Sequence, residues 1–195
     1  MHPSFNKSYR GSPPWDIGRP QTQFVKLAEN GEIRGKILDV GCGTGENAIF
    51  LSKFGKGVWG IDSAPLAIEK AKLKAQERDA RVKFLVGDAF HLEDLRTKFN
   101  TVTDCGLFHI FSDQERPLFT KSLRSVMSTQ GTYFMLAFST KEPGGWGGPR
   151  RVSEEEIRNV FRRGWKINYV KDCRLETNLH PDGGKGLLSS ITKSE

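Results

Sequence analysis

A short glycine-rich stretch is the part of this sequence best suited to ligand chemistry. Residues 36–45 read KILDVGCGTG, so Gly41, Gly43 and Gly45 stand at alternate positions after a run of branched apolar residues. Glycines with this spacing let the backbone approach a ligand closely. Dinucleotides, nucleoside triphosphates and sulfonium nucleosides all bind glycine loops, and the neighbouring residues must distinguish between them.

The residues around the glycines exclude two of these ligands. A triphosphate loop needs Lys and then Ser or Thr after its last glycine, whereas Gly45 is followed by Glu46 and Asn47. A dinucleotide loop carries glycine at its sixth position, where this chain places Glu46, whose charge has the wrong sign for a diphosphate. Asp39 adds an acid before the loop. These acids favour a ligand with an ammonium or sulfonium charge and no phosphate.

Two further acids end the next two predicted strands. Asp62, followed by Ser63, is placed to accept hydrogen bonds from two ribose hydroxyls. Asp88 lies in the sequence GDA and is placed to accept from an adenine amino group, while the backbone near Ala89 and Phe90 reads the edge of the ring. Open α/β sheets bind ligands at the carboxyl ends of their strands, so we expect these acids to share one site.

The rest of the chain predicts the scaffold that positions these acids. Short apolar runs alternate with helical patterns, and the continuous apolar character of ILDV and VWGI is typical of parallel strands covered on both faces. The predicted strands are 36–40, 57–62, 82–87, 101–105, 132–138, 166–175 and 187–192, and the predicted helical segments are 46–54, 65–78, 92–95, 113–128 and one that begins with a capping box of Ser153 and Glu156. This order predicts an α/β fold: a Rossmann-like, seven-stranded, mostly parallel sheet with helices on both faces and a C-terminal antiparallel hairpin.

Length and composition set the limits of this scaffold. At 195 residues, with 36% hydrophobic and 27% charged residues, the chain suits one soluble domain. No apolar run reaches the ~18 residues that span a bilayer. The N-terminus lacks an apolar signal stretch, so we expect a cytoplasmic protein without a membrane partner. Three widely spaced cysteines indicate neither a disulfide framework nor a metal site.

The motifs DVGCGTG at 39–45, Asp62 and GDA at 87–89 resemble, in this order and at this spacing, those of the class I S-adenosylmethionine-dependent methyltransferases. The resemblance covers nearly the whole chain. It implies S-adenosyl-L-methionine as the cofactor, S-adenosyl-L-homocysteine as its product, and no metal. It also implies a cofactor site made of Trp15, Asp39, Gly41, Cys42, Gly43, Gly45, Asp62, Ser63, Asp88, Ala89, Phe90, Asp104 and Cys105.

Three longer segments narrow the resemblance. SPPWDIGRPQ (12–21), DCGLFHIFSDQER (104–116) and FSTKEPGGWGGPRRVSEEEIR (138–158) look like those of small-molecule methyltransferases related to thiopurine and thiol methyltransferases, including bacterial enzymes that methylate heterocyclic toxins. This subgroup implies that residues 1–34 form a lid and first helix over the cofactor, with Trp15 against its methionine end, and that residues 35–195 form the core of a single domain. Cys105 stands where the subgroup usually has Ser, so no polar role is carried over there.

The resemblance implies methyl transfer to a small molecule, namely a thiol, a phenol or a hydroxy-heterocycle, by an in-line displacement. His109, just past the fourth predicted strand, is the candidate base or orienter of the acceptor; alternatively it packs between Phe108 and Phe111. Asp104 contacts the cofactor or the substrate, or it caps its loop. Thiols need no dedicated base, because a few per cent of a thiol of pKa ~8.5 is already ionised at neutral pH.

The candidate substrate residues are Tyr9, Phe108, His109, Trp146, Arg150 and Arg151. The two arginines either grip an anionic substrate or pair with Glu154 and Glu155. We expect the glycine-rich loop 144–149 to close over the pocket as a second lid, together with the N-terminal segment.

The net charge of +7 permits an anionic partner such as nucleic acid. The sequence after the fourth strand argues against nucleic acid, because Asp104–Cys105–Gly106–Leu107–Phe108 stands where amino-directed enzymes have the Asp/Asn-Pro-Pro-aromatic motif that grips a flipped base. The Pro-Cys nucleophile of cytosine C5 methylation is also missing, since no cysteine follows a proline. We therefore expect a small-molecule acceptor and a monomer or weak homodimer. The alternatives are a cofactor-binding regulator or partner subunit without catalysis and, third, an NAD-dependent oxidoreductase.

Overall fold

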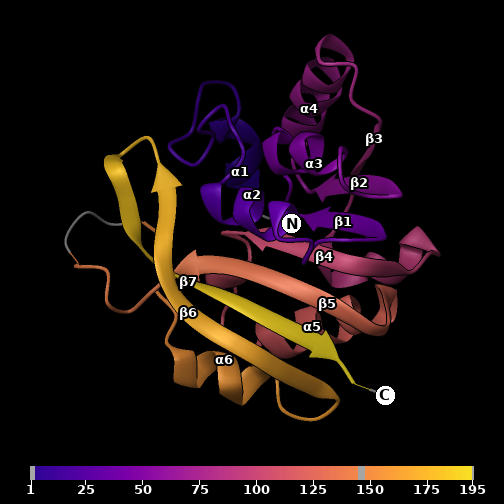
Figure 1. Cartoon of the computed structure of the whole chain (residues 1–195). Helices are drawn as coiled ribbons and strands as arrows, with labels where there is room; N and C mark the ends of the chain where they lie inside the picture. The colour runs from indigo at the N-terminus through magenta and orange to yellow at the C-terminus, as the bar shows by residue number, and fades with distance from the viewer. Residues whose placement is uncertain (1–2, 145–147, 195) are drawn as a thin grey trace.

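The computed structural model describes residues 3–144 and 148–194, and within them the chain forms a seven-stranded sheet (Figure 1). The strand order is β3-β2-β1-β4-β5-β7-β6. The strands are β1 (Lys36–Val40), β2 (Gly57–Asp62), β3 (Val82–Val86), β4 (Phe99–Cys105), β5 (Met127–Phe138), β6 (Trp165–Thr177) and β7 (His180–Lys193). The first five run parallel, and β7 is antiparallel to both β5 and β6. The predicted fold class, including the C-terminal hairpin, is confirmed.

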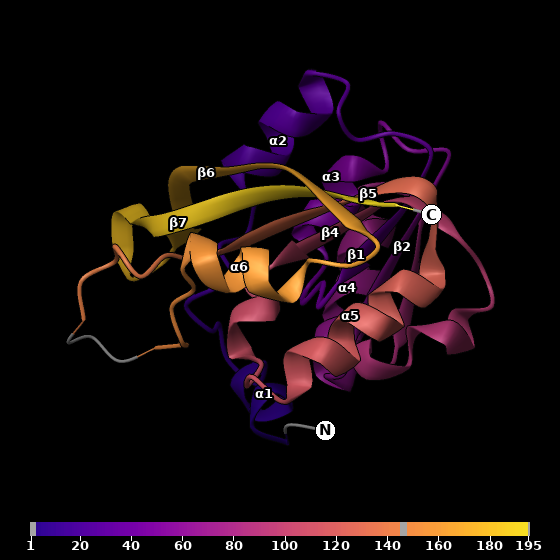
Figure 2. The same cartoon turned by 90° about the horizontal axis from the view of Figure 1, so that it is seen from below.

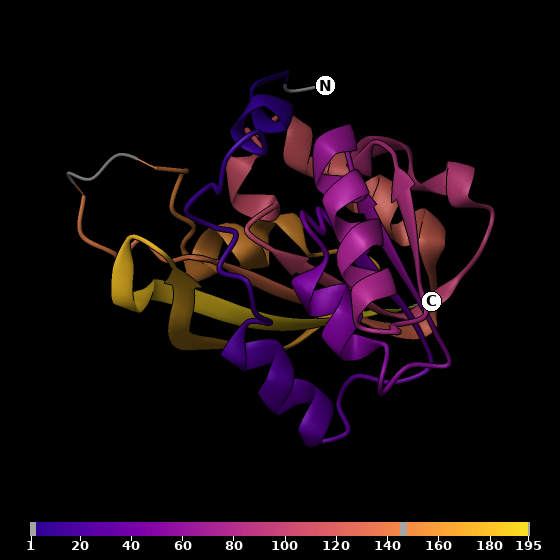
Figure 3. The same ribbon diagram turned by 90° about the horizontal axis from the view of Figure 1, so that it is seen from above.

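Helices cover both faces of this sheet, as Figures 2 and 3 show from opposite sides. The α-helices are α1 (Pro3–Ser8), α2 (Thr22–Glu29), α3 (Glu46–Leu51), α4 (Pro65–Glu77), α5 (Glu115–Val126) and α6 (Glu154–Val160), with 3-10 turns η1 (Ala89–Leu95) and η2 (Phe108–Ile110). Alternate residues of β1 serve opposite faces. Ile37 packs in the core with α2, α3 and α4, and Leu38 packs in the core with α5 and α6.

The C-terminal strands are longer than the sequence predicted. β7 begins at His180 and so takes in most of the segment NLHPDGGKG (178–186), which we expected to be a loop. Its glycines explain the difference, because a Cβ atom on Gly186 would lie 3.1 Å from the carbonyl oxygen of Ala137 in β5. A glycine-rich run usually predicts a turn. In this chain the absence of side chains at the glycines lets β7 pass close to the neighbouring strand β5.

Local chemistry fixes the start of α6 beside the sheet edge. The Ser153 hydroxyl accepts the N–H of Glu156 at 3.1 Å, and the Glu156 carboxylate accepts the N–H of Ser153 at 2.7 Å. The predicted capping box is confirmed. It anchors the end of the loop that carries Arg150. No helix in the described ranges is both long enough and apolar enough to cross a bilayer.

Candidate active site

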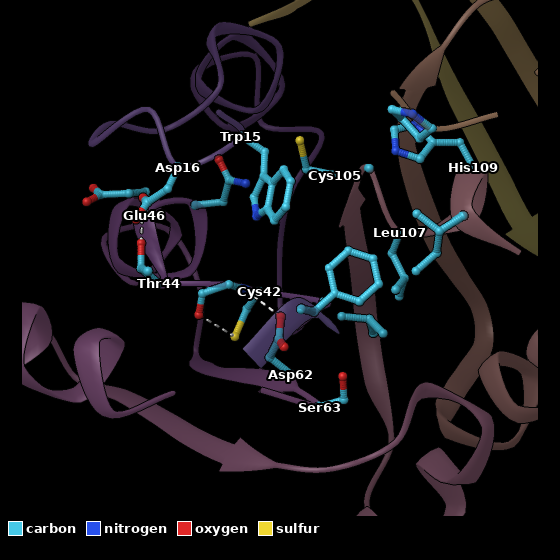
Figure 4. Close-up of a pocket in the computed structure, with 18 of the residues that line it drawn as sticks. Trp15, Asp16, Cys42, Thr44, Glu46, Asp62, Ser63, Cys105, Leu107 and His109 are labelled. Atoms are coloured by element: carbon cyan, nitrogen blue, oxygen red, sulfur yellow. Dashed lines mark hydrogen bonds between the residues drawn. The ribbon is translucent and has the colours of Figure 1, made fainter. Parts of the chain in front are cut away.

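A cavity of about 960 Å³ opens at the carboxyl ends of β1, β2, β3 and β4 (Figure 4). Its floor is the glycine loop and the ends of the next two strands, and its roof comes from the N-terminal segment and the turn between β6 and β7. Ligand pockets usually measure ~300–1,000 Å³. The cavity therefore has the size to hold a nucleoside and a second small molecule together.

The glycine loop is held by backbone hydrogen bonds to the neighbouring strand. The N–H groups of Gly41 and Cys42 both donate to the carbonyl oxygen of Ile61, at 2.8 and 3.0 Å. Gly45 lies in the left-handed region, with φ at 85°, and a Cβ atom there would lie 2.6 Å from the Phe84 ring. The third glycine thus serves the close packing of the loop against β3 and the start of α3.

Two acids end neighbouring strands at the cavity, as predicted. One oxygen of Asp62 accepts the N–H of Gly43 at 2.9 Å and the other accepts that of Ala64 at 2.8 Å. Burial raises the pKa of Asp62. One oxygen of Asp88 accepts the N–H of Phe90 at 2.9 Å. Of the residues predicted for the cofactor, the cavity is lined by Trp15, Gly41, Cys42, Gly43, Gly45, Asp62, Ser63, Asp88, Ala89, Phe90 and Cys105.

Asp39 does not line the cavity, which corrects its predicted contact with the ligand. It is buried beneath the loop, where one carboxylate oxygen accepts the Thr103 hydroxyl at 2.8 Å and the other has no partner among the described residues. Burial raises its pKa to about 7. Glu46 reaches the cavity wall, but its carboxylate pairs with Lys74 on α4 and with Arg78, which follows the end of that helix. The negative charge predicted there is therefore largely balanced.

Asp104 and Phe108 also lie away from the cavity. The Asp104 carboxylate is fully buried and accepts hydrogen bonds from the N–H groups of Leu107 and Phe108, at 2.7 and 3.0 Å, and from the Tyr133 hydroxyl at 2.6 Å. Burial raises its pKa to about 6. Of the two interpretations of Asp104, the loop cap is the one that the geometry supports. The cap starts the turn η2, which directs Phe108 into the core against Phe161 and leaves Leu107 at the cavity.

His109 lines the cavity although only 5% of it is exposed. Its ring stacks on that of Phe138, with 5.5 Å between the centroids and 11° between the planes, and the Phe138 N–H donates to Nδ1 at 3.2 Å. Burial, with a smaller contribution from the Arg116 guanidinium, lowers the pKa of His109 to about 3. The imidazole is therefore neutral at physiological pH, and with so low a pKa it is a weak proton acceptor, which disfavours its predicted role as a base.

The N-terminal segment is tied to the cavity by contacts that the sequence did not reveal. The Trp15 indole donates to the Tyr9 hydroxyl at 3.0 Å, and both side chains line the cavity. Asp16 accepts the Thr44 hydroxyl of the glycine loop at 2.7 Å. The N–H of Asn178, in the β6–β7 turn, donates to the Pro14 carbonyl at 2.8 Å. Asp16, Thr44 and Asn178 are separated widely in sequence, so local patterns carry no signal for these pairs.

The predicted arginines have different positions. Arg150 lines the cavity and pairs with Asp113, at 2.8 Å, and with Glu156, instead of Glu154 or Glu155. Arg151 does not line the cavity, and its guanidinium donates to the Pro143 carbonyl at 3.1 Å. Trp146 lies outside the described residues. The wall also includes side chains that we did not predict. The apolar ones are Ile17, Leu107, Ile110, Phe111, Phe138, Leu175 and Leu179, and the polar ones include Arg19, Gln21, Asn47, Glu176 and Thr177.

Comparisons with known proteins identify the family. Residues 37–131 match the model of a methyltransferase domain. The chain is 34% identical, over 89% of its own length and 81% of the relative's, to 2-heptyl-1-hydroxyquinolin-4(1H)-one methyltransferase of Mycobacteroides abscessus. The chain belongs to the S-adenosylmethionine-dependent methyltransferases. It is also 30% identical to a probable thiol methyltransferase of Arabidopsis thaliana, over 77% of this chain and 67% of that protein.

A solved structure supports the same family membership, and its alignment extends over the whole of this chain. It is described as showing the conversion of a disulfide bond into a thioacetal group during echinomycin biosynthesis. The alignment covers 100% of this chain and 93% of that one, at 29% identity and a TM-score of 0.88. The predicted family, the small-molecule subgroup and S-adenosylmethionine as the cofactor are confirmed.

The residues at the glycine loop of this methyltransferase fit its cofactor. S-adenosylmethionine, when bound, supplies an electrophilic methyl group on a positively charged sulfur. The ends of β2 and β3 present acids to the cavity, and Lys74, which contacts Thr44 of the glycine loop, is also engaged with Glu46. An adenosyl sulfonium needs acids and close backbone, and it needs no cation for a phosphate.

Proposed function

We propose that this methyltransferase transfers the methyl group to an oxygen or sulfur nucleophile on a small, flat acceptor, namely a thiol, a phenol or a hydroxy-heterocycle. The observation that carries the proposal is one continuous cavity, which is lined by the glycine loop with Asp62 and Asp88 and also by a group of apolar side chains. Such a wall suits an aromatic or heterocyclic acceptor, because the transfer of its apolar surface from water into the cavity is favourable.

The proposal assigns the two parts of the cavity to two ligands. Asp62 would hold the ribose of the cofactor, and the segment from Asp88 to Phe90 would hold its adenine. Tyr9 and Trp15 would cover the methionine end, because their linked side chains lie over Gly43, where a Cβ atom would come within 2.9 Å of the Tyr9 hydroxyl. The acceptor would then occupy the space beside Leu107, Phe111 and Phe138.

The ionisable groups of the described cavity wall are poorly placed to remove a proton from the acceptor. Asp62 and Asp88 accept backbone N–H groups, and Asp16, Glu46 and Glu176 lie within 4 Å of lysine or arginine nitrogens. Burial raises the pKa of the Tyr9 hydroxyl and of the Cys42 and Cys105 thiols, and His109 is neutral with its Nδ1 lone pair engaged. The acceptor must therefore bring a nucleophile that ionises by itself near neutral pH.

Thiols and acidic hydroxyls on electron-poor rings meet this requirement, and aliphatic alcohols do not. Two relatives have names in these two chemical classes, one a hydroxyquinolinone methyltransferase and the other a probable thiol methyltransferase. The work of the protein is then to position the anion and exclude water, and positioning alone contributes on the order of 7–11 kcal/mol to a reaction between two bound groups.

An acceptor panel tests the proposal. Purified protein and S-adenosylmethionine are incubated with 1-hydroxyquinolin-4(1H)-one, thiophenol, phenol and benzyl alcohol, and S-adenosylhomocysteine is quantified. We expect product with the acidic hydroxyl or the thiol, much less with phenol, whose pKa is ~10, and none with benzyl alcohol. Tight binding of S-adenosylmethionine by calorimetry without product from any acceptor would support the alternative, a cofactor-binding protein without catalysis.

A further inference from the structure

The contact between Phe138 and His109 fixes which imidazole nitrogen carries the proton. The Phe138 N–H donates to Nδ1 of His109 at 3.2 Å, so Nδ1 must present a lone pair. A neutral imidazole has a single N–H, which therefore lies on Nε2. Stacking on the Phe138 ring holds the imidazole in this orientation.

The surroundings of His109 keep its ring neutral. Arg116 is fully buried, and its guanidinium lies over the ring of Phe108, 4.8 Å from the ring centre. Phe108 directly precedes His109 in the chain. The Arg116 charge is shared with Asp113 and Glu156, at 3.6 and 3.1 Å. A second positive charge on His109 would therefore lie in an apolar site close to an existing cation, and its solvation there is unfavourable.

The protonated nitrogen faces the cavity and lacks a partner. Nε2 lies 3.3 Å from the position of a Cβ atom on Gly106, and both residues line the cavity. No hydrogen bond joins Nε2 to another residue within the described parts of the chain. Figure 4 shows His109 and Leu107 on one side of the pocket and Thr44 and Glu46 on the other. A donor at the edge of a largely apolar cavity, with no partner in the described residues, favours a ligand that supplies an acceptor atom.

We propose that His109 is a specificity-determining donor, whose Nε2–H binds an oxo oxygen of the methyl acceptor that is conjugated with the nucleophile. A donor on the nucleophilic atom itself would stabilise the anion before transfer and slow the reaction. A donor on a conjugated oxygen holds the ring in register, leaves the lone pairs of the nucleophilic atom accessible, and takes less electron density from that atom than a direct hydrogen bond would. The inference rests on the proposed function and narrows its acceptors to hydroxy- or mercapto-heterocycles that carry an oxo group.

Two variants separate the roles of the two ring nitrogens. His109→Asn places an amide oxygen near the Nδ1 position, where it can still accept the Phe138 N–H, but it has no donor at the Nε2 position. His109→Gln places an amide donor near the Nε2 position. The probes are 3-hydroxyquinolin-4(1H)-one and 3-hydroxyquinoline. They share the bicyclic ring and the 3-hydroxyl, and they differ in the oxo group and in the ring nitrogen, which bears a hydrogen only in the first; the change in preference from wild type to His109→Asn isolates the contact with His109. Their affinities are measured by calorimetry with S-adenosylhomocysteine present.

We expect the wild-type protein to bind the oxo probe about tenfold more tightly than its partner, which is the effect of one hydrogen bond. His109→Asn should abolish this preference, and His109→Gln should recover part of it. An equal preference in wild type and His109→Asn, or no preference in the wild type, overturns the inference. Nitrogen-15 NMR of the imidazole at pH 7 gives a second readout: protonation of Nδ1 or of both nitrogens also overturns it.

Failure of the proposed function is recognised separately. If neither probe yields S-adenosylhomocysteine with the wild-type protein, methylation of this class is contradicted, whereas the binding ratio and the NMR tautomer still decide the role of His109. If product forms from both probes at equal efficiency in wild type and His109→Asn, methylation stands and the donor role does not.

Discussion

One carboxylate oxygen of Asp62 accepts the N–H of Gly43 at 2.9 Å, so the acid that ends β2 also shapes the glycine loop that follows β1. Its other oxygen accepts the N–H of Ala64 at 2.8 Å, which fixes the start of α4. Both oxygens keep a second lone pair for a ligand. A single side chain thus couples the shape of the loop to the proposed ribose contact.

Asp62→Asn should weaken the binding of S-adenosylmethionine by about 10- to 100-fold, because hydrogen bonds to a charged group contribute ~1.5–3 kcal/mol. The measurement is a calorimetric titration. Asp94→Asn is the matched control, since Asp94 is exposed and does not line the cavity. Equal affinities of the two variants for the cofactor would show that Asp62 does not contact it.

Gly45→Ala should destabilise the fold more than Gly31→Ala. Both glycines have positive φ, 85° and 73°, so both variants incur the ~1–2 kcal/mol cost of a left-handed residue with a side chain. A Cβ atom on Gly31 meets nothing within 4 Å, whereas one on Gly45 would lie 2.6 Å from the Phe84 ring. Overpacking should therefore add about 1–3 kcal/mol at Gly45. Urea denaturation measures the difference, and equal losses would contradict the packing argument.

Asn178→Ala should loosen the N-terminal segment. Its side-chain amide donates to the Asp16 carbonyl at 2.9 Å and helps to join the β6–β7 turn to the proposed lid. We expect faster hydrogen exchange at residues 9–19 in the variant, and slower exchange there when S-adenosylmethionine binds to the wild type. Asn168→Ala is the control, because Asn168 bonds to Ser190 and Thr192 within the hairpin. Unchanged exchange on cofactor binding would count against a lid.

Asp39→Asn should change how stability depends on pH. The pKa of Asp39 is raised to about 7 in the folded protein, whereas it is ~3.9 in an unfolded chain. Between these values the folded state binds more protons than the unfolded state, so Asp39 makes the free energy of unfolding fall as pH rises from about 4 to 7. In Asp39→Asn this contribution to the fall in the free energy of unfolding is absent.

The measurement is the difference in unfolding free energy between Asp39→Asn and wild type, from urea titrations at pH 4.5 and pH 8. Between pH 4.5 and pH 8 this difference should change by about 1–4 kcal/mol in the direction that makes the variant more stable relative to wild type. The lowered pKa of His109 acts in the opposite direction below pH ~6.5, and it cancels in this comparison. A difference that is the same at both pH values would show that Asp39 is ionised in the folded protein.

The sequence predicted the features that depend on local pattern. Continuous apolar runs located β1 and β2 at their observed bounds, and the rule on strand ends brought Asp62 and Asp88 to one cavity. Asp39 and Phe108, which we also predicted for the site, lie outside the cavity, because alternation along β1 and the turn η2 direct these side chains inward. Contacts between distant segments, such as Asp16 with Thr44, have no local signature at all.

The central claim is that the acceptor supplies its own anion and the protein supplies no base. It is tested most directly by the pH dependence of kcat/KM for a series of substituted thiophenols and acidic phenols of graded pKa. The account predicts that the midpoint of each profile follows the pKa of the free acceptor. A midpoint that stays at one pH for every acceptor would assign the ionisation to a group of the protein and contradict the account.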